Sequence, residues 1–140
     1  MQNFDEMLED AFSARYLPAH LGVALVSCGH GKARMRLPYR EAHLQNLGVL
    51  QGGITATLID ISLAWAVLSA VHPAQGHTIN LTVSYLRPIT TEDIECEAVV
   101  LRAGRSVAIA RAEVTTASGV LVAAGSGSFL VRQPVPKGVH

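Results

Sequence analysis

One carboxylate, Asp60, lies near the centre of an otherwise almost entirely apolar run, residues 54–71. Burying a charged carboxylate among apolar groups costs free energy unless the charge is paired or solvated. A carboxylate kept in such a place can act as a nucleophile or as a general base on water. Asp60 is therefore a candidate catalytic residue. An interpretation in which Asp60 only reaches solvent at the edge of a helix is equally open at this point.

The residues just before this run, Gln51, Gly52 and Gly53, could bind an anion. The first N–H groups of a helix have no partner inside the helix, and they lie at the positive end of its dipole. Because glycine has no Cβ, a ligand can approach this backbone closely. Such a helix start can stabilise a developing oxyanion. The plainer alternative is that the two glycines form only a flexible turn.

A helical projection of residues 54–71 separates a bulky stripe from a face of small residues. The stripe, which we expect to pack on a sheet, contains Ile54, Leu58, Ile61, Trp65 and Leu68. Asp60 lies on the other face, beside Gly53, Ala56, Thr57 and Ala64. Small side chains permit close approach of a second helix or of a ligand.

Alternating patterns predict the strands that would surround this helix. Two strands, 21–28 and 32–38, are joined by a tight turn at "GHG", and a loop leads from there to the helix. After Pro73, four alternating segments follow, at 77–88, 93–102, 106–117 and 120–132. Near the N-terminus, apolar residues at helical spacing predict a short helix over 3–16 within the segment 1–18, ended near Pro18.

One long helix and about six mostly antiparallel strands indicate an α+β architecture in which the sheet wraps around the helix. The chain of 140 residues fits a single domain, 1–140, with a flexible tail at 132–140.

The composition favours a soluble globular protein over several other classes. Hydrophobic residues make up 49% and charged residues 16%, and eleven basic residues balance eleven acidic ones. This balance predicts no binding to nucleic acid or to acidic membranes. A central Asp argues against a membrane span over 54–71, and the acidic N-terminus has no basic residue before Arg15, unlike a signal peptide. Cys28 and Cys96 fit two reduced thiols in a cytoplasmic protein, although the sequence leaves a disulfide open.

No metal is expected, because the six histidines show no paired metal-ligand spacing. No cofactor is expected either, because a carboxylate, water and an oxyanion-binding helix start suffice for hydrolysis. The "GHGK" segment lacks the upstream glycine and the following Ser or Thr of a phosphate loop, and it is interpreted as a hairpin turn. Trp65 is most simply a core residue. Arg102 and Arg105 flank a second predicted hairpin turn, where they serve either solubility or the binding of an anionic ligand.

Three segments together carry a family resemblance: "HLQNLGVLQGGITATLID", "TINLTVSYLRP" and "LRAGRSVAIARAEV". They resemble the hotdog-fold acyl-CoA thioesterases of the phenylacetate-degradation and 4-hydroxybenzoyl-CoA type, over roughly residues 20–131. The most specific part is the turn G-x-x-(His/Gln)-G-G entering a helix, with an acidic residue nine positions after the His or Gln. The resemblance implies a homodimer or homotetramer that acts on acyl-CoA substrates.

The resemblance also implies roles for individual residues. Asp60 would be the catalytic carboxylate, and Gly52 would polarise the thioester carbonyl through its N–H. Gln45 would help to position the reacting groups, and the Thr78 hydroxyl would hold the attacking water. Gln51 stands where close relatives usually have His, and Gln cannot change its charge near neutral pH.

The substrate-binding set that the resemblance implies is Gln51, Gly53, Arg102 and Arg105, the two arginines contacting the nucleotide part of coenzyme A. The acyl group is aromatic or of medium length by this interpretation. Two other functions stay open: an acyl-thioester dehydratase or hydratase, and a non-catalytic acyl-CoA binding module. The dehydratase fits less well, because it would need a His paired with an acidic residue.

Asp60 lies eight residues after Gly52 along one predicted helix. The two residues are therefore about 12 Å apart along the helix axis. A thioester carbonyl needs its hydrogen-bond donors and its attacking group close at the same time. We therefore predict an active site shared between protomers, with Gly52 and Gln45 from one chain and Asp60 from the other.

Overall fold

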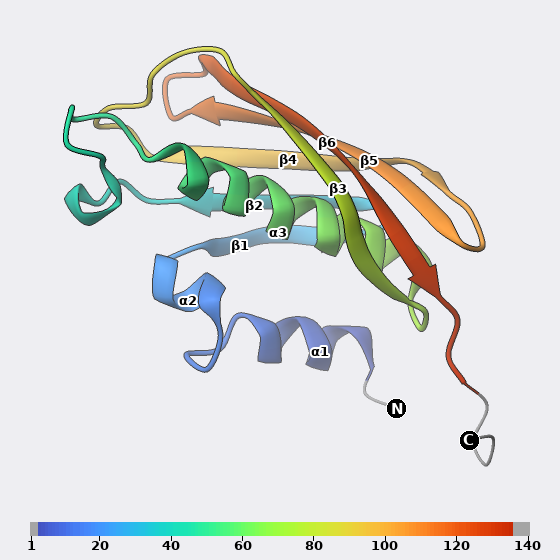
Figure 1. Cartoon of the computed structure of the whole chain (residues 1–140). Coiled ribbons are helices and arrows are strands. Elements are labelled where there is room, and N and C mark those ends of the chain that lie inside the picture. The colour runs from blue at the N-terminus through green and yellow to red at the C-terminus, as the bar shows by residue number, and fades with distance from the viewer. Residues whose placement is uncertain (1–2, 136–140) are drawn as a thin grey trace.

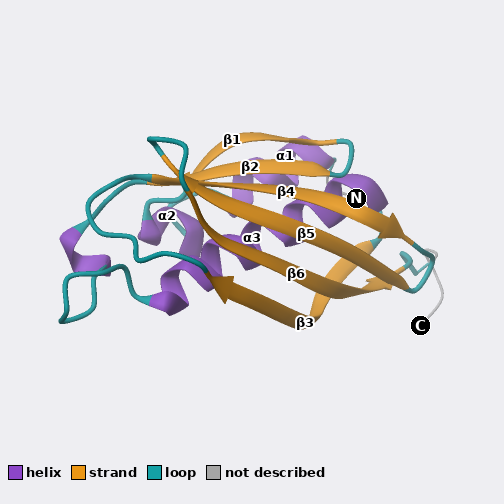
Figure 2. Cartoon of the chain, turned by 90° about the horizontal axis from the view of Figure 1, so that it is seen from above, coloured by secondary structure: helices purple, strands orange, loops and turns teal. Residues whose placement is uncertain are grey.

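The computed structural model describes residues 3–135 and consists of a six-stranded antiparallel sheet packed on one long helix, α3 (Gly52–Val71) (Figure 1). The strands are β1 (Ala24–Gly29), β2 (Lys32–Leu37), β3 (Gln75–Tyr85), β4 (Ile94–Ala103), β5 (Val107–Thr116) and β6 (Leu121–Arg132). Their order across the sheet is β1-β2-β4-β5-β6-β3. The predicted α+β architecture is confirmed, and Figure 2 shows α3 running beneath the sheet.

The six predicted strands are all present, but several boundaries are shifted, such as those of β3, which was predicted over 77–88 and spans Gln75–Tyr85. The turn between β1 and β2 is formed by His30 and Gly31, both with positive φ (53° and 76°), as expected of a two-residue hairpin turn. The prediction that the first strand begins at residue 21 is wrong, because a short helix, α2 (Leu17–Leu21), occupies this part of the chain. β6 continues through Arg132, so the predicted tail begins later, and residues 136–140 of that tail lie outside the described part.

The predicted helix over 3–16 is wrong in its C-terminal half. Helix α1 spans only Phe4–Ala11, and its N-cap residue, Asn3, accepts a hydrogen bond from the Glu6 N–H at 2.8 Å. Pro18 does not end this helix. It lies in the first turn of α2, where the missing N–H of proline removes no helical hydrogen bond.

The side of α3 that packs on the sheet also differs from the prediction. The buried residues of α3 are Thr55, Leu58, Ile59, Ser62, Leu63, Trp65, Ala66 and Val67. From the predicted stripe, only Leu58 and Trp65 belong to this set, and the other three residues are half-buried. Because α3 is apolar around most of its circumference, the projection could not identify the face that meets the sheet.

Trp65, from the predicted stripe, lies against the N-terminal segment. The Trp65 ring contacts the ring of Phe4 edge-on, with centroids 5.9 Å apart, and that of Phe12, with centroids 6.3 Å apart. The interpretation of Trp65 as a core residue is confirmed, since only 9% of it is exposed. Helix α1 thus covers one flank of α3.

Two glycines of β6 determine how closely α3 approaches the sheet. A Cβ on Gly125 would lie 3.0 Å from a methyl group of Ile59, and a Cβ on Gly127 would lie 3.2 Å from Leu63. The helix therefore lies directly on the backbone of β6. This contact fixes the rotation of α3, and Asp60 consequently faces the neighbouring edge strand, β3.

Helix α3 has the length and apolar composition of a membrane span. In this fold, however, eight of its residues are buried against protein, and the sheet and α1 surround much of it. It is the core helix of a soluble domain.

Candidate active site

The Asp60 carboxylate is paired with the Thr78 hydroxyl. Thr78 Oγ1 donates a hydrogen bond of 2.9 Å to Asp60 Oδ1, and the Asp60 side chain is half-buried. Thr78 pairs with the buried Phe129 of β6, which places its side chain on the inner face of the sheet, toward α3. A β-bulge follows immediately at Ile79. The structure thus brings together two of the four predicted catalytic residues, with the second carboxylate oxygen left for another partner.

The N-terminus of α3 presents two backbone donors. The preceding loop is fixed by two hydrogen bonds, from the Leu50 N–H to the Ile89 carbonyl (2.7 Å) and from the Gln51 N–H to the His43 carbonyl (3.0 Å). Within residues 3–135, the N–H groups of Gly52 and Gly53 have no acceptor, as expected of the first residues of a helix without a side-chain cap. This end of α3 can therefore hydrogen-bond to a carbonyl oxygen.

Gln45 closes the loop that leads to these glycines. Its side-chain oxygen accepts a hydrogen bond from the Leu47 N–H, and its own N–H donates to the Val49 carbonyl at 2.8 Å. The amide NH₂ of Gln45 is not used in these contacts. The side chain of Gln51, in contrast, is exposed and does not cap α3. In the described structure Gln51 contributes its backbone to the loop rather than its side chain.

Tyr85 is a residue of this site that the sequence did not indicate. Its hydroxyl donates a hydrogen bond of 2.6 Å to the Gly52 carbonyl, and a Cβ on Gly52 would lie 3.3 Å from the phenol. A side chain at position 52 would therefore require a small shift of the tyrosine ring. No local pattern could reveal this contact, because it joins residues 33 positions apart.

His43 is a second residue that sequence analysis missed. Only 9% of it is exposed, and its Nδ1 has no hydrogen-bond partner among the described residues. Burial, and to a smaller extent the charge of Arg40, lowers the pKa of His43. Its imidazole is therefore favoured in the neutral form, and its backbone carbonyl serves to hold the loop before Gly52.

Arg102 and Arg105 lie far from the N-terminus of α3. They flank the predicted hairpin turn, which is confirmed between β4 and β5, and the Gln133 side chain donates to the Arg105 carbonyl at 3.1 Å. A cavity of about 480 Å³ beside Arg105 is also lined by Ala70 and Val71, the last residues of α3. Arg105 therefore lies near the C-terminal end of the helix.

One chain does not bring all predicted catalytic residues together. Gly52 and Gln45 lie at the start of α3, whereas Asp60 and Thr78 lie two turns further on. Helix α3 is continuous from Gly52 onward. The axial separation of Gly52 and Asp60 is therefore about 12 Å, at the ordinary rise of an α-helix. The chain thus presents two separate groups of candidate residues, Gly52 with Gln45 and Asp60 with Thr78, here called half-sites.

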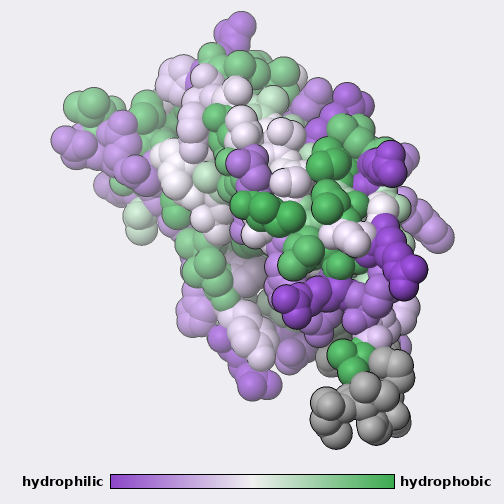
Figure 3. Space-filling view, turned by 45° about the vertical axis from the view of Figure 1, so that its right-hand side comes forward, coloured by the Kyte–Doolittle hydropathy of each residue, from purple (hydrophilic) through white to green (hydrophobic). Residues whose placement is uncertain are grey.

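Both half-sites border a flank of α3 that the described chain leaves open. Asp60, Thr57 and Ala64 are half-buried there, Gly53 is exposed, and a Cβ on Gly53 would meet nothing within 4 Å. The neighbouring strand β3 is a sheet edge of eleven residues. Ile79 and Tyr85 are 59% and 55% exposed along it, and on this side of the molecule apolar side chains reach the surface between polar ones (Figure 3).

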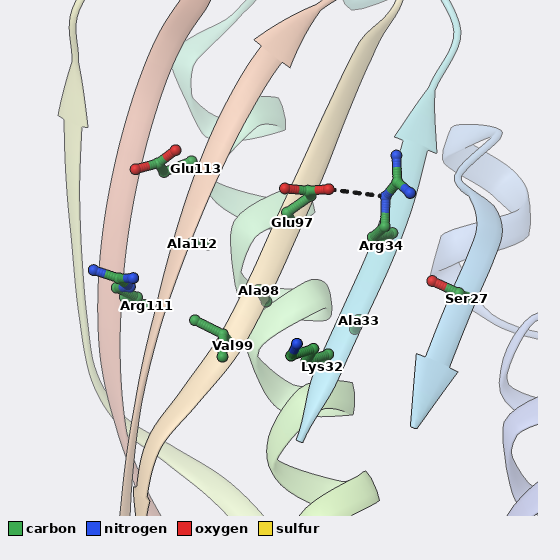
Figure 4. A pocket seen from close by; sticks show the side chains of 10 residues that line it. All are labelled: Ser27, Lys32, Ala33, Arg34, Glu97, Ala98, Val99, Arg111, Ala112 and Glu113. Carbon is green, nitrogen blue, oxygen red and sulfur yellow. Dashed lines mark ion pairs between the residues drawn. The ribbon is translucent and has the colours of Figure 1, made fainter. Parts of the chain in front are cut away.

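A hollow of about 490 Å³ on the opposite face of the sheet is not part of this arrangement (Figure 4). Its lining includes Arg34 and Glu97, which form an ion pair. Arg34 also contacts Glu95, which in turn contacts Arg36. Burial opposes ionisation of Glu95, but hydrogen bonds from the two arginines outweigh it and lower its pKa. These four side chains pair with one another, and we interpret the hollow as a solvated face of the sheet.

Comparison with known proteins identifies the family. Residues 47–123 match the family model described as the Thioesterase superfamily, a segment that includes Gly52, Asp60, Thr78 and Tyr85. The chain is 33% identical to human acyl-coenzyme A thioesterase 13, over 89% of this chain and 91% of the human protein.

Solved structures agree with this result. The conserved protein PA5202 of Pseudomonas aeruginosa is 32% identical, with a TM-score of 0.81 over 88% of this chain and 97% of that one. A variant of the phenylacetic acid degradation protein PaaI of Thermus thermophilus is 28% identical, with a TM-score of 0.75 over 81% and 96% of the two chains. The hotdog fold expected from the sequence is confirmed. With the matched segment covering Gly52, Asp60 and Thr78, this chain belongs to the Thioesterase superfamily and is a thioester hydrolase.

Proposed function

We propose that this protein hydrolyses acyl-CoA thioesters to a free acid and coenzyme A, with Asp60 as the catalytic carboxylate. The observation that carries the proposal is the combination of unpartnered N–H groups at Gly52 and Gly53, among the described residues, with a half-buried carboxylate held by Thr78. The name of the related human enzyme supports acyl-CoA as the substrate.

The reaction needs only these groups and water. The thioester oxygen accepts hydrogen bonds from the Gly52 and Gly53 N–H groups, which stabilise the negative charge that develops on it. Asp60 either takes a proton from the attacking water or attacks the carbonyl carbon itself to form an anhydride that water then cleaves. In both routes the C–S bond breaks, and the thiolate of coenzyme A leaves and takes up a proton.

We further propose that each active site is shared between two protomers. The sheet covers one side of α3 and helix α1 covers another, so the open flank around Asp60 is available to a second copy. The free edge of β3 could pair antiparallel with the same strand of that copy, which would protect its unpaired backbone groups. Isologous two-fold contact along this flank would bring Gly52 of one chain to Asp60 of the other. A dimer of this kind is the minimal active unit, and a tetramer would contain two of them.

The location of Arg105 supports the same arrangement. Arg105 lines the same cavity as Ala70, which lies close to the C-terminal end of α3. Along the helix axis, Ala70 is much closer to Asp60 than to Gly52. We therefore propose that Arg102 and Arg105 bind the phosphates of coenzyme A in the site to which their own chain contributes Asp60. Arginine is well suited to this role because its guanidinium binds phosphate through two parallel hydrogen bonds.

An apolar cavity beside Gly52 supports an aromatic or medium-chain acyl group. Its volume is about 300 Å³, and its lining includes Val49, Leu50, Thr55, Tyr85 and Ile89. This volume is at the lower end of the range for small-molecule sites, which favours one ring or a short chain over a long one.

The test is release of free thiol from a panel of acyl-CoA esters, including phenylacetyl-CoA and hexanoyl-CoA, followed with a thiol reagent. We expect turnover with at least one member, and a kcat roughly a hundredfold or more lower for the Asp60→Asn variant. Binding without thiol release would instead establish a non-catalytic acyl-CoA module. Hydration of an enoyl-CoA without thiol release would establish a hydratase.

We also propose a reducing, cytoplasmic environment. Cys28 and Cys96 are both free thiols in the structure. Burial raises the pKa of Cys28 to about 11 and that of Cys96 to about 12. Both are therefore poor nucleophiles near neutral pH.

A further inference from the structure

The Tyr85 hydroxyl and the two candidate oxyanion donors are linked through the first peptide units of α3. The carbonyl of Gly52 belongs to the same peptide unit as the N–H of Gly53, and it accepts the hydrogen bond from Tyr85 at 2.6 Å. The carbonyl of Gln51 belongs to the same unit as the N–H of Gly52, and it accepts from the Ile54 N–H at 2.9 Å. Each candidate donor thus lies in a peptide unit whose carbonyl is already hydrogen-bonded.

This geometry affects both the orientation and the strength of the donors. A hydrogen bond to a peptide carbonyl polarises the unit, which makes its N–H a better donor. It also restricts rotation of the peptide plane, and neither glycine has a side chain to do so. Gln51 provides no side-chain cap, and the Thr57 hydroxyl donates to the next carbonyl, that of Gly53, at 2.8 Å. Among residues 3–135, the tyrosine is therefore the one side chain that hydrogen-bonds to the Gly52–Gly53 peptide unit.

The strand that carries Tyr85 is well placed for this role. Tyr85 is the last residue of β3 and pairs with Ala123 of β6. The next residue, Leu86, is anchored by donation from its N–H to the Val122 carbonyl at 2.9 Å. The phenol is therefore held at a fixed position beside Gly52, even though the residue is 55% exposed.

We propose that Tyr85 is a positioning residue of the active site: its hydroxyl holds the Gly52–Gly53 peptide so that both N–H groups point together at the thioester oxygen. The role rests on the proposed function, since it supposes that these groups bind the oxyanion. Tyr85 makes its contribution through the backbone and does not itself have to touch the reacting atoms.

The test compares Tyr85→Phe with Tyr39→Phe. Each variant loses one phenolic hydroxyl from a partly exposed ring, but the described structure shows no hydrogen bond from the hydroxyl of Tyr39. We expect Tyr85→Phe to lower kcat about fivefold, by a similar factor for every acyl-CoA tested, with little change in KM. Tyr39→Phe should leave both constants unchanged. An unchanged kcat in Tyr85→Phe, or a loss confined to KM and dependent on the acyl group, would overturn the proposal.

A spectroscopic measurement separates this proposal from the proposed function. We expect the carbonyl ¹³C shift of Gly52 and the amide ¹⁵N shift of Gly53 to move in Tyr85→Phe and not in Tyr39→Phe. If the wild type releases no thiol from any acyl-CoA, the proposed function fails. A change in these two chemical shifts would still support the hydrogen bond by which Tyr85 orients the Gly52–Gly53 peptide. Unmoved shifts overturn the role of Tyr85 whatever the activity.

Discussion

Asp60→Asn is expected to lower kcat for acyl-CoA hydrolysis by roughly a hundredfold or more. Asparagine has nearly the same shape as aspartate, and its side-chain oxygen can still accept the hydrogen bond from Thr78. It cannot take a proton from water or attack a carbonyl as a carboxylate does. The substitution therefore removes the chemistry and leaves the packing, and initial rates over a range of acyl-CoA concentrations measure its effect.

Asp93→Asn is a matched control for this change. Asp93 is also a carboxylate that accepts a hydrogen bond, from the Tyr39 N–H at 2.7 Å, but it lies outside the open flank of α3. We expect its kcat to stay within about twofold of the wild type. A folded Asp60→Asn variant with a near-normal kcat would show that another group activates the water.

Gly52→Pro is expected to lower kcat by about a hundredfold to a thousandfold, the usual effect of losing one oxyanion donor. Proline has no N–H but is well tolerated at the first position of a helix. The preceding residue, Gln51, already has an extended ψ of 129°. A following proline favours this extended conformation. The substitution thus deletes the candidate donor with little disturbance of α3.

Gly52→Ala is the control that isolates the N–H group. Alanine and proline both place a Cβ about 3.3 Å from the Tyr85 phenol, so both require a small shift of this exposed ring. Only proline removes the donor. We expect Gly52→Ala to retain most of the wild-type kcat. Equal losses in the two variants would mean that crowding against Tyr85, and not the missing N–H, causes the defect.

The sequence predicted the sheet well because its strands alternate. In β5 and β2, for instance, buried and exposed residues follow each other with period two. The helix boundaries in the N-terminal region were harder to predict. Pro18 lies at the start of α2, and proline is compatible with the start of a helix as well as with its end. The rotation of α3 was not predictable from its own residues. It depends on Gly125 and Gly127, which lie far away in the sequence, on β6.

The sequence predicted those residues of the candidate site that stand out from their neighbours along the chain. Asp60 was noticeable because it interrupts an apolar run, and Gly52 because it starts a helix. Thr78 was indicated by family resemblance alone, and its contact with Asp60 requires the pairing of β3 with β6. Tyr85 was missed for the same reason: only the register of the folded sheet brings its hydroxyl to Gly52.

The central claim is that one active site takes Gly52 from one chain and Asp60 from another, and mixing two inactive variants tests it most directly. Asp60→Asn and Gly52→Pro would be unfolded together, refolded, and assayed for thiol release, with mixed dimers verified by differently tagged chains. Each mixed dimer would contain one doubly damaged site and one intact site.

With statistical pairing, half of the dimers are mixed, so about a quarter of all sites should recover wild-type activity. Each variant refolded alone should stay inactive and serves as the baseline. Recovery near this level is the result that the shared site predicts. Verified mixed dimers with no activity above the baseline would contradict it.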